Sequence, residues 1–185
     1  MDTQWVDSSQ HIYQFGICID SLDVQEHWMR NGDNPAAIFA RLGFTGTLAD
    51  RINRVSAVVL DPTKLRAGMP YYTFTSVDST ETIRHIAFAK TLTDYAIIDL
   101  YGDSISAHAF SKPITLKRKY AEGVLNSSLW NVIKASGDDP FLAIKLSDVY
   151  AWQIDFFDIK EGDAYQVLYH EAYIDDTTSL SIASI

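Results

Sequence analysis

The sequence is poor in several features that would point to particular classes of protein. It has one cysteine in 185 residues, Cys18, so an internal disulfide is excluded. No apolar run reaches the roughly 20 residues that a transmembrane helix needs, and the first ten residues, MDTQWVDSSQ, have neither the basic start nor the apolar stretch of a signal peptide. The sequence therefore predicts no membrane span, and it leaves two alternatives open, a cytosolic protein or one whose signal peptide has been removed.

Positive charge is also scarce. The chain has 15 basic and 24 acidic residues, a formal net charge of -9 and a pI near 4.8, and its basic residues are scattered apart from LKRKY at 116–120. Binding to phosphates needs a clustered positive surface, so the sequence argues against nucleic acid and anionic membranes as partners. At 47% hydrophobic residues, the chain can bury a core and should form one domain or two small ones.

Common catalytic and metal-binding motifs are missing as well. The histidines are dispersed singly, with no pair separated by one residue and no pair one helical turn apart, and there is no cysteine pair. No Gly-x-Ser-x-Gly motif or glycine-rich phosphate loop occurs. Cys18 has apolar neighbours, which favours a small core residue over a nucleophile. We therefore predict no catalytic residue and no metal ligand in this chain, and expect none from the histidines His11, His27, His85, His108 and His170.

Periodicity indicates an α+β protein. The first third predicts a strand at 22–29, helices at 33–43 and 47–58, and a strand at 69–76. Pro35 suits the first position of the first helix. From Thr82 onward, period-two stretches predict an antiparallel meander, then two inserted helices, then two strands around a turn at Asp175–Asp176; these elements are expected at 82–91, 94–102, 104–111, 114–123, 126–137, 138–152, 163–176 and 179–185.

Aromatic and acidic residues alternate in DVYAWQIDFFDIKEGDAY, residues 148–165. Paired carboxylates beside aromatic rings are typical of a glycosidase. However, Asp155 and Asp158 are three apart, and if this passage is extended they point to opposite faces. The spacing therefore favours a structural role for the stretch, and sugar stacking on Trp152 is the alternative.

Two blocks of this sequence resemble a known family. VLNSSLW (124–130) and LAIKLSDVYAWQIDFFDIKEGDAYQVLYHEAYID (142–175) are similar to the non-catalytic region that precedes the peptidase domain in lysostaphin-type (LytM) zinc endopeptidases of Gram-negative bacteria. FGICIDSLDVQEHWMRNGDNPAAIFARLGF (15–44) and LDPTKLRAGMPYYTF (60–74) resemble a LysM-like module at the N-terminus of the same proteins. The resemblance extends from about Phe15 to the end of the chain.

The resemblance implies a periplasmic or envelope metallopeptidase that hydrolyses peptidoglycan cross-links. Its zinc would be held by a His-x-x-x-Asp motif and a His-x-His motif, and neither occurs in these 185 residues. The resemblance therefore places the catalytic domain, and the only zinc, beyond Ile185. It divides the chain into an N-terminal strand or linker (1–21), a LysM-like module (22–76) and a truncated domain of mixed sheet and helices (77–185).

Three functions follow as hypotheses. In the first, the chain regulates the peptidase, for example by autoinhibition, or positions its substrate, and its partner is peptidoglycan or the protein's own catalytic domain. In the second, it is a stand-alone glycan-binding protein of the cell envelope. The candidate contacts for glycan or the partner domain are Trp28, Trp152, Asp155 and Asp158. In the third, it is a glycosidase that uses two carboxyl groups among Asp148, Asp155, Asp158 and Glu161.

Overall fold

The structure of the protein is a computed structural model, which describes residues 11–156, 158–174 and 177–185. Among these residues are four α-helices and strands that pair antiparallel throughout, so the α+β class predicted from the sequence is confirmed. The chain forms two compact units, which meet in sequence at Lys112 and Pro113. None of the described helices combines the length and the apolar character needed to cross a membrane.

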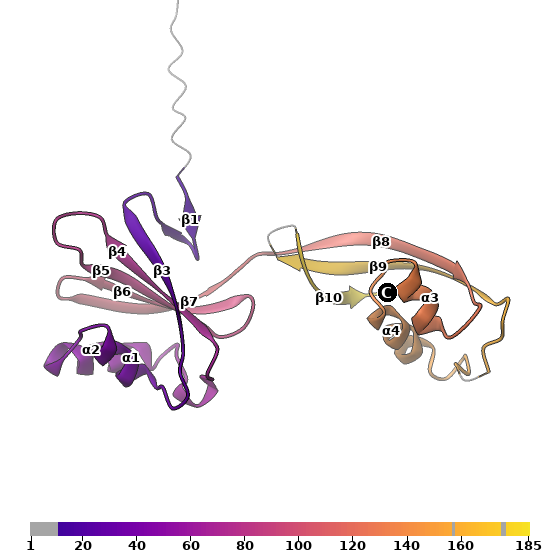
Figure 1. The fold of residues 1–185 in the computed structure, drawn as a ribbon, viewed down its shortest axis with the longest axis horizontal. Coiled ribbons are helices and arrows are strands. Elements are labelled where there is room, and N and C mark those ends of the chain that lie inside the picture. The colour runs from indigo at the N-terminus through magenta and orange to yellow at the C-terminus, as the bar shows by residue number, and fades with distance from the viewer. Residues whose placement is uncertain (1–10, 157, 175–176) are drawn as a thin grey trace, which may run out of the picture. The chain divides into compact units, whose positions relative to one another are not determined.

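The first unit is built on a five-stranded antiparallel sheet (Figure 1). Its strands lie in sequence order: β3 (Leu22–Trp28), β4 (Pro70–Ser76), β5 (Ile83–Ala89), β6 (Asp94–Tyr101) and β7 (Ser104–Ser111). β4 hydrogen-bonds to β3 on one side and to β5 on the other. The domain boundary expected between residues 76 and 77 therefore falls inside this one sheet.

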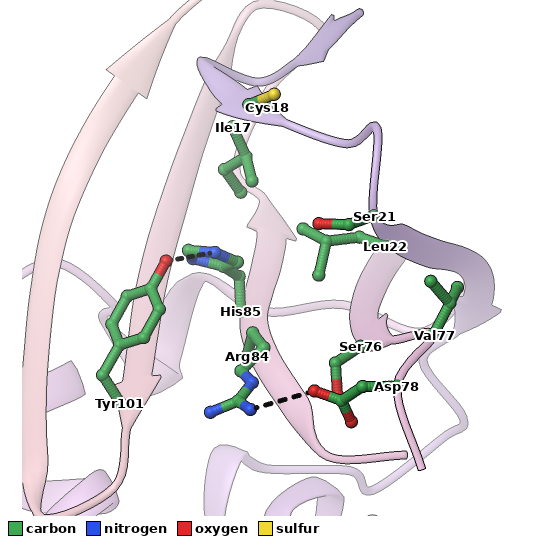
Figure 2. Close-up of a pocket in the computed structure, with 10 residues that line it drawn as sticks. All are labelled: Ile17, Cys18, Ser21, Leu22, Ser76, Val77, Asp78, Arg84, His85 and Tyr101. Carbon is green, nitrogen blue, oxygen red and sulfur yellow. Dashed lines mark hydrogen bonds and ion pairs between the residues drawn. The ribbon is translucent and has the colours of Figure 1, made fainter. Parts of the chain in front are cut away.

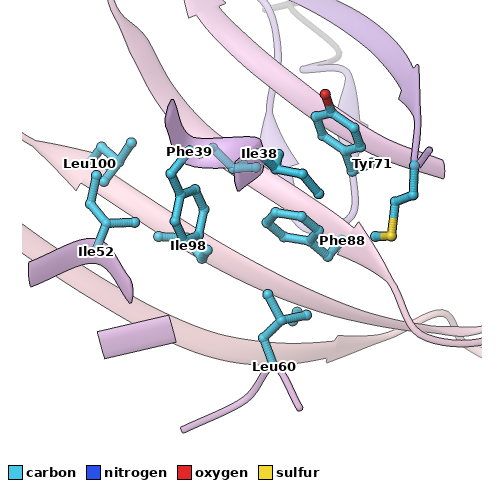
Figure 3. Close-up of a cluster of buried hydrophobic side chains, with 11 residues drawn as sticks. Ile38, Phe39, Ile52, Leu60, Tyr71, Phe88, Ile98 and Leu100 are labelled. Atoms are coloured by element: carbon cyan, nitrogen blue, oxygen red, sulfur yellow. The ribbon is translucent and has the colours of Figure 1, made fainter. Parts of the chain in front are cut away.

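Two helices and a short 3-10 turn cover one face of this sheet. They are α1 (Pro35–Arg41), α2 (Gly46–Ser56) and η1 (Pro62–Lys64). Asn34 caps α1 by accepting a hydrogen bond from the Ala37 backbone N–H at 2.9 Å, and a proline occupies the first turn. The buried core between helices and sheet, shown in Figure 3, includes Ile38, Phe39, Ile52, Leu60, Tyr71, Phe88, Ile98 and Leu100.

The opposite face of the same sheet is covered by a small hairpin, β1 (Tyr13–Gln14) and β2 (Ile17–Cys18). Phe15 at its turn stacks on Tyr95, with ring centroids 4.1 Å apart, and Phe15 and Ile17 are both buried. Because both faces are covered, β5 and β6 are apolar at most positions. Cys18, expected in the core, is exposed, since it points away from the face that carries Ile17.

The second unit has a three-stranded antiparallel sheet in the order β10-β9-β8. The strands are β8 (Ile114–Val124), β9 (Ala164–Ile174) and β10 (Thr178–Ser184), and α3 (Leu129–Ala135) and α4 (Phe141–Tyr150) pack on one face. Ser128 caps α3 by accepting a hydrogen bond from the Asn131 N–H at 3.3 Å. The two inserted helices predicted from the sequence are confirmed.

Two details of the prediction were wrong. The strand expected to end the meander, 114–123, does not continue the first sheet but pairs as β8 with β9. The described residues around Asp155 and Asp158 are not extended: residues 151–156 and 158–162 form turns and irregular backbone, and the Asp158 N–H donates to the Asp155 carbonyl at 3.0 Å. The argument from opposite strand faces therefore does not apply there. The turn predicted at 175–176 lies outside the described residues.

Candidate functional site

A cavity of about 490 Å³ lies on the hairpin side of the first sheet, where the apolar cover of the hairpin ends (Figure 2). Ile17 and Leu22 form part of its apolar lining, and charged and hydrogen-bonding groups complete it. A cavity of mixed character with several converging polar groups is the usual form of a ligand site. All the residues that line it belong to the first unit.

A β-bulge brings two neighbouring residues of β5 into this cavity. Phe74 pairs with His85, and the next residue, Thr75, pairs with Ile83, so Arg84 is an extra residue on β5. Successive residues of a regular strand point to opposite faces, whereas a bulge redirects one of them. Arg84 and His85 therefore both line the cavity.

His85 is the centre of a hydrogen-bonded network across three strands. Its Nδ1 lies 2.8 Å from Asp99 Oδ1 and its Nε2 lies 2.9 Å from the Tyr101 hydroxyl. Because a carboxylate only accepts, Nδ1 carries the proton that faces Asp99, and Nε2 accepts from Tyr101. The second Asp99 oxygen accepts from the Ser106 hydroxyl at 2.8 Å and lies 3.2 Å from His108 Nδ1. The network holds the Tyr101 hydroxyl in place at the cavity wall.

Opposite the His85 and Tyr101 network, a tight loop around Asp78 supplies further polar groups to the cavity. Hydrogen bonds from the Thr80 side chain and backbone and from Ser76, together with the positive charge of Arg84, lower the pKa of Asp78 to about 2. Arg84 Nη2 lies 3.5 Å from Asp78 Oδ2 (Figure 2). The cavity thus holds a carboxylate that stays ionised at neutral pH beside a guanidinium group.

This arrangement is suited to binding rather than to nucleophilic chemistry. Burial, and then the charge of Asp99, raise the pKa of Tyr101, so its phenol stays protonated. The hydroxyl that His85 Nε2 contacts is this phenol, whose raised pKa disfavours the anion that a nucleophile would need. A ligand with both charged and amide groups could bind Arg84, Asp78 and the Tyr101 hydroxyl without a reaction.

The residues proposed from the sequence lie elsewhere. Trp28 is 57% exposed at the end of β3 in the first unit. Trp152 is 99% exposed in the irregular segment after α4, where it lines a shallow depression together with Asp155. Asp158 is exposed in the same segment, with the Lys160 amine 4.0 Å from its carboxylate. The structure thus brings Trp152 and Asp155 to one surface, and Trp28 belongs to the other unit.

Cys18 and His85 were considered from the sequence and given no site role, and the other residues of the cavity were not singled out. One signal was available, because His85 and Asp99 are polar residues inside strands that are mostly apolar. Buried polar groups of this kind need partners, and that makes them candidates for a network. The bulge that redirects Arg84 had no comparable signal.

No family model matches the chain. In sequence it is 22% identical over 161 residues to the peptidoglycan DD-endopeptidase ShyC of Vibrio cholerae serotype O1, a match that covers 82% of this chain and 35% of ShyC. The chain shows weak homology to this endopeptidase.

Solved structures give a similar result. A zinc-containing peptidase from Vibrio cholerae matches with a TM-score of 0.51 and 18% identity, over 84% of this chain and 47% of that protein. Csd3 of Helicobacter pylori matches with a TM-score of 0.52 and 16% identity, over 85% of this chain and 43% of Csd3. The chain thus spans less than half the length of each of these proteins, and at these identities the structures establish a shared fold.

Proposed function

We propose that this chain is the non-catalytic region of a peptidoglycan zinc metalloendopeptidase, in which it regulates the enzyme or positions the substrate. The observation that carries the proposal is the match to ShyC, which extends over 82% of this chain but 35% of that endopeptidase. The sequence contains neither a His-x-x-x-Asp nor a His-x-His motif. The catalytic domain and its zinc would then lie beyond residue 185, and the parent protein would work in the periplasm or cell envelope of a Gram-negative bacterium.

The first unit provides features suited to wall contact. β3, α1, α2 and β4 follow one another in the order expected of a LysM-like module, and β3 is an edge strand with Trp28 exposed at its end. We assign glycan or partner-domain contact to this edge. The difference from an isolated module is that β4 continues into three more strands, so the edge is supported by a larger core.

The cavity is the second feature that supports substrate positioning. Peptidoglycan stem peptides carry amide, ammonium and carboxylate groups. Arg84, the ionised Asp78 and the Tyr101 hydroxyl offer matching charges and hydrogen bonds. In the intact enzyme, Arg84→Ala is expected to weaken cross-link hydrolysis through a higher KM, with an unchanged zinc content. A lower zinc content would indicate a structural defect instead.

The proposal is tested first at the level of the gene. We expect the reading frame to continue past the codon for Ile185 and to encode a His-x-x-x-Asp motif followed by a His-x-His motif. A frame that stops at Ile185 would overturn the assignment to a peptidase. The parent enzyme, if the motifs are present, should then be assayed for peptidoglycan hydrolysis with and without this region.

A stand-alone peptidoglycan-binding protein of the envelope is the second candidate. It is favoured by Trp152, which is almost fully exposed beside acidic residues and could stack on a sugar ring. This function predicts saturable binding of the 185-residue chain to purified peptidoglycan, lost in Trp152→Ala. Tyr120→Ala is the matched control, because Tyr120 is also exposed in the second unit but lies on β8. If Trp152→Ala binds peptidoglycan as tightly as Tyr120→Ala does, Trp152 is not part of the binding site.

A further inference from the structure

The hairpin on the first sheet brings three residues together that are scattered in the sequence. In its register Tyr13 pairs with Cys18, and the Ile19 N–H donates to the Ile12 carbonyl at 2.9 Å, so the pairing continues outward to His11 and Asp20. Cys18 and Asp20 are two apart and therefore lie on one face. His11 lies across from Asp20 on that same face.

This hairpin is well held in place. Its two turn residues, Phe15 and Gly16, have positive φ angles of 52° and 79°, the conformation of a tight hairpin turn. The Phe15 and Ile17 side chains are buried against the sheet, which anchors one face of the hairpin. The opposite face, which carries the three residues, is thereby held outward in a defined arrangement.

The polar atoms of these residues converge. His11 Nδ1, Cys18 Sγ and an Asp20 carboxylate oxygen all lie within 4.8 Å of one another, and His11 Nδ1 is 2.6 Å from Asp20 Oδ2. The other Asp20 oxygen accepts from the Ile12 N–H at 2.9 Å, so the backbone orients the carboxylate. Within the described parts of the chain, this is the one group of three such side chains close enough to share an ion.

We propose that His11, Cys18 and Asp20 bind a zinc ion. Zinc takes thiolate, imidazole and carboxylate ligands at about 2.0–2.3 Å, which in a tetrahedron places the ligand atoms roughly 3.3–3.8 Å apart. The separations in the structure, from 2.6 Å between His11 and Asp20 up to at most 4.8 Å, bracket this range. The fourth position is left for water or for a group from another molecule.

The donor set favours zinc over the other divalent ions. Calcium and magnesium prefer all-oxygen sites, whereas a thiolate and an imidazole suit zinc. The thiol loses its proton on binding, so the thiolate and the carboxylate together balance the charge of the ion. Bound zinc would link His11, which precedes β1, to Cys18 on β2, and this link would stabilise the hairpin. Cys18 also lines the cavity described above, at its hairpin end (Figure 2).

The test is a metal titration of the full 185-residue chain without an affinity tag. We expect one zinc ion per chain by calorimetry, and a cobalt(II) complex with a thiolate-to-metal charge-transfer band. Cys18→Ser should abolish that band and weaken zinc binding at least tenfold, and His11→Ala should weaken it similarly. Thermal unfolding of the unmodified chain should shift upward with added zinc.

A matched control separates this site from other histidines. His108 is also an exposed histidine that faces an aspartate, with its Nδ1 3.2 Å from Asp99 Oδ2, but no cysteine lies with it. His108→Ala should keep stoichiometric zinc binding. The proposal fails if the unmodified chain binds no zinc, if Cys18→Ser binds it as tightly, or if His108→Ala alone removes it. Circular dichroism of each variant shows whether the fold is retained.

Discussion

The two units of the molecule use a β-sheet in different ways. The sheet of the first unit is covered on both faces, by α1 and α2 on one and by the β1-β2 hairpin on the other. The sheet of the second unit is covered by α3 and α4 on one face. On its other face β8 and β9 carry apolar side chains that are 44–63% exposed, namely Ile114, Leu116, Tyr120, Val124 and Leu168.

This difference in covering indicates where each unit obtains its stability. Burial of apolar surface on both sides makes β5 and β6 the centre of the first unit. The second unit has one apolar layer, and the covered face of its sheet also holds a buried polar group. There Glu171 is 4% exposed and lies 2.6 Å from the Lys119 amine. We therefore expect the stability of the first unit to come mainly from apolar packing, and the stability of the second unit to depend more on polar contacts.

The largest effect should come from the doubly covered sheet. Phe88 is fully buried, and its ring packs against Phe39 and Tyr71. Phe88→Ala is expected to lower the free energy of unfolding of the first unit by about 3–5 kcal/mol, because it leaves a cavity. Residue-resolved amide hydrogen exchange checks this, with faster exchange in β5 and β6. Leu92→Ala, in an exposed turn, is the control, and an equal loss in both would contradict the packing argument.

A close approach in the second unit provides the next test. A Cβ on Gly123 would lie 2.8 Å from Tyr165 Cε1 and 3.1 Å from Val132 Cγ1. Gly123→Ala should therefore lower the free energy of unfolding of this unit by about 1–3 kcal/mol through overpacking. Urea unfolding measures the loss, with the neighbouring exposed residue in Glu122→Ala as the control. A neutral result would mean that the single apolar layer is loose enough to absorb a methyl group.

The polar contacts of the second unit predict a dependence on pH. Burial alone would raise the pKa of Glu171, but hydrogen bonds from Lys119, Ser179 and Tyr173 outweigh it and lower the pKa. A carboxyl group with a lowered folded pKa stabilises the protein above its ordinary unfolded pKa, and this contribution is lost as the pH falls through the folded value.

Glu171→Gln should remove this contribution. We expect a loss of about 1–3 kcal/mol in unfolding free energy at neutral pH, because a charged hydrogen-bonding partner of Lys119 is replaced. The gap between variant and unmodified protein should narrow as the pH falls below the ordinary carboxyl range. Unfolding in urea at several pH values measures it, and the exposed Glu122→Gln serves as the control. A difference in unfolding free energy that does not change with pH would mean that the Glu171 side chain stabilises the unit through packing and not through its charge.

Local signals in the sequence predicted much of the fold. Asn34 and Pro35 marked the start of α1, and period-two stretches located most strands within a few residues. Pairing between distant segments was less predictable, because it depends on contacts that no local pattern records. Ile114 pairs with Ile174, sixty positions later, so nothing near residue 114 indicated that β8 belongs to a second sheet.

The same limit applies to the candidate sites. His11 and Cys18 are seven positions apart, which fits no metal motif of a helix or a single strand, and only the hairpin register brings them together. Arg84 reaches the cavity because of a bulge. A sequence search would find such groups only if it first placed the turn at Phe15–Gly16 and the pairing of β4 with β5.

The smallest expected effect tests the contrast between the two sheets most directly. Val167 and Leu168 are neighbours on β9 and point to opposite faces, with exposures of 6% and 44%. Val167→Ala should lower the free energy of unfolding by about 1–3 kcal/mol, because the covered face loses packing. Leu168→Ala should change it by no more than about 0.5 kcal/mol. Urea unfolding of both variants under one set of conditions measures the difference. If Leu168→Ala costs as much as Val167→Ala, the outer face of β8 and β9 is covered in solution, and the second sheet is then packed on both sides like the first.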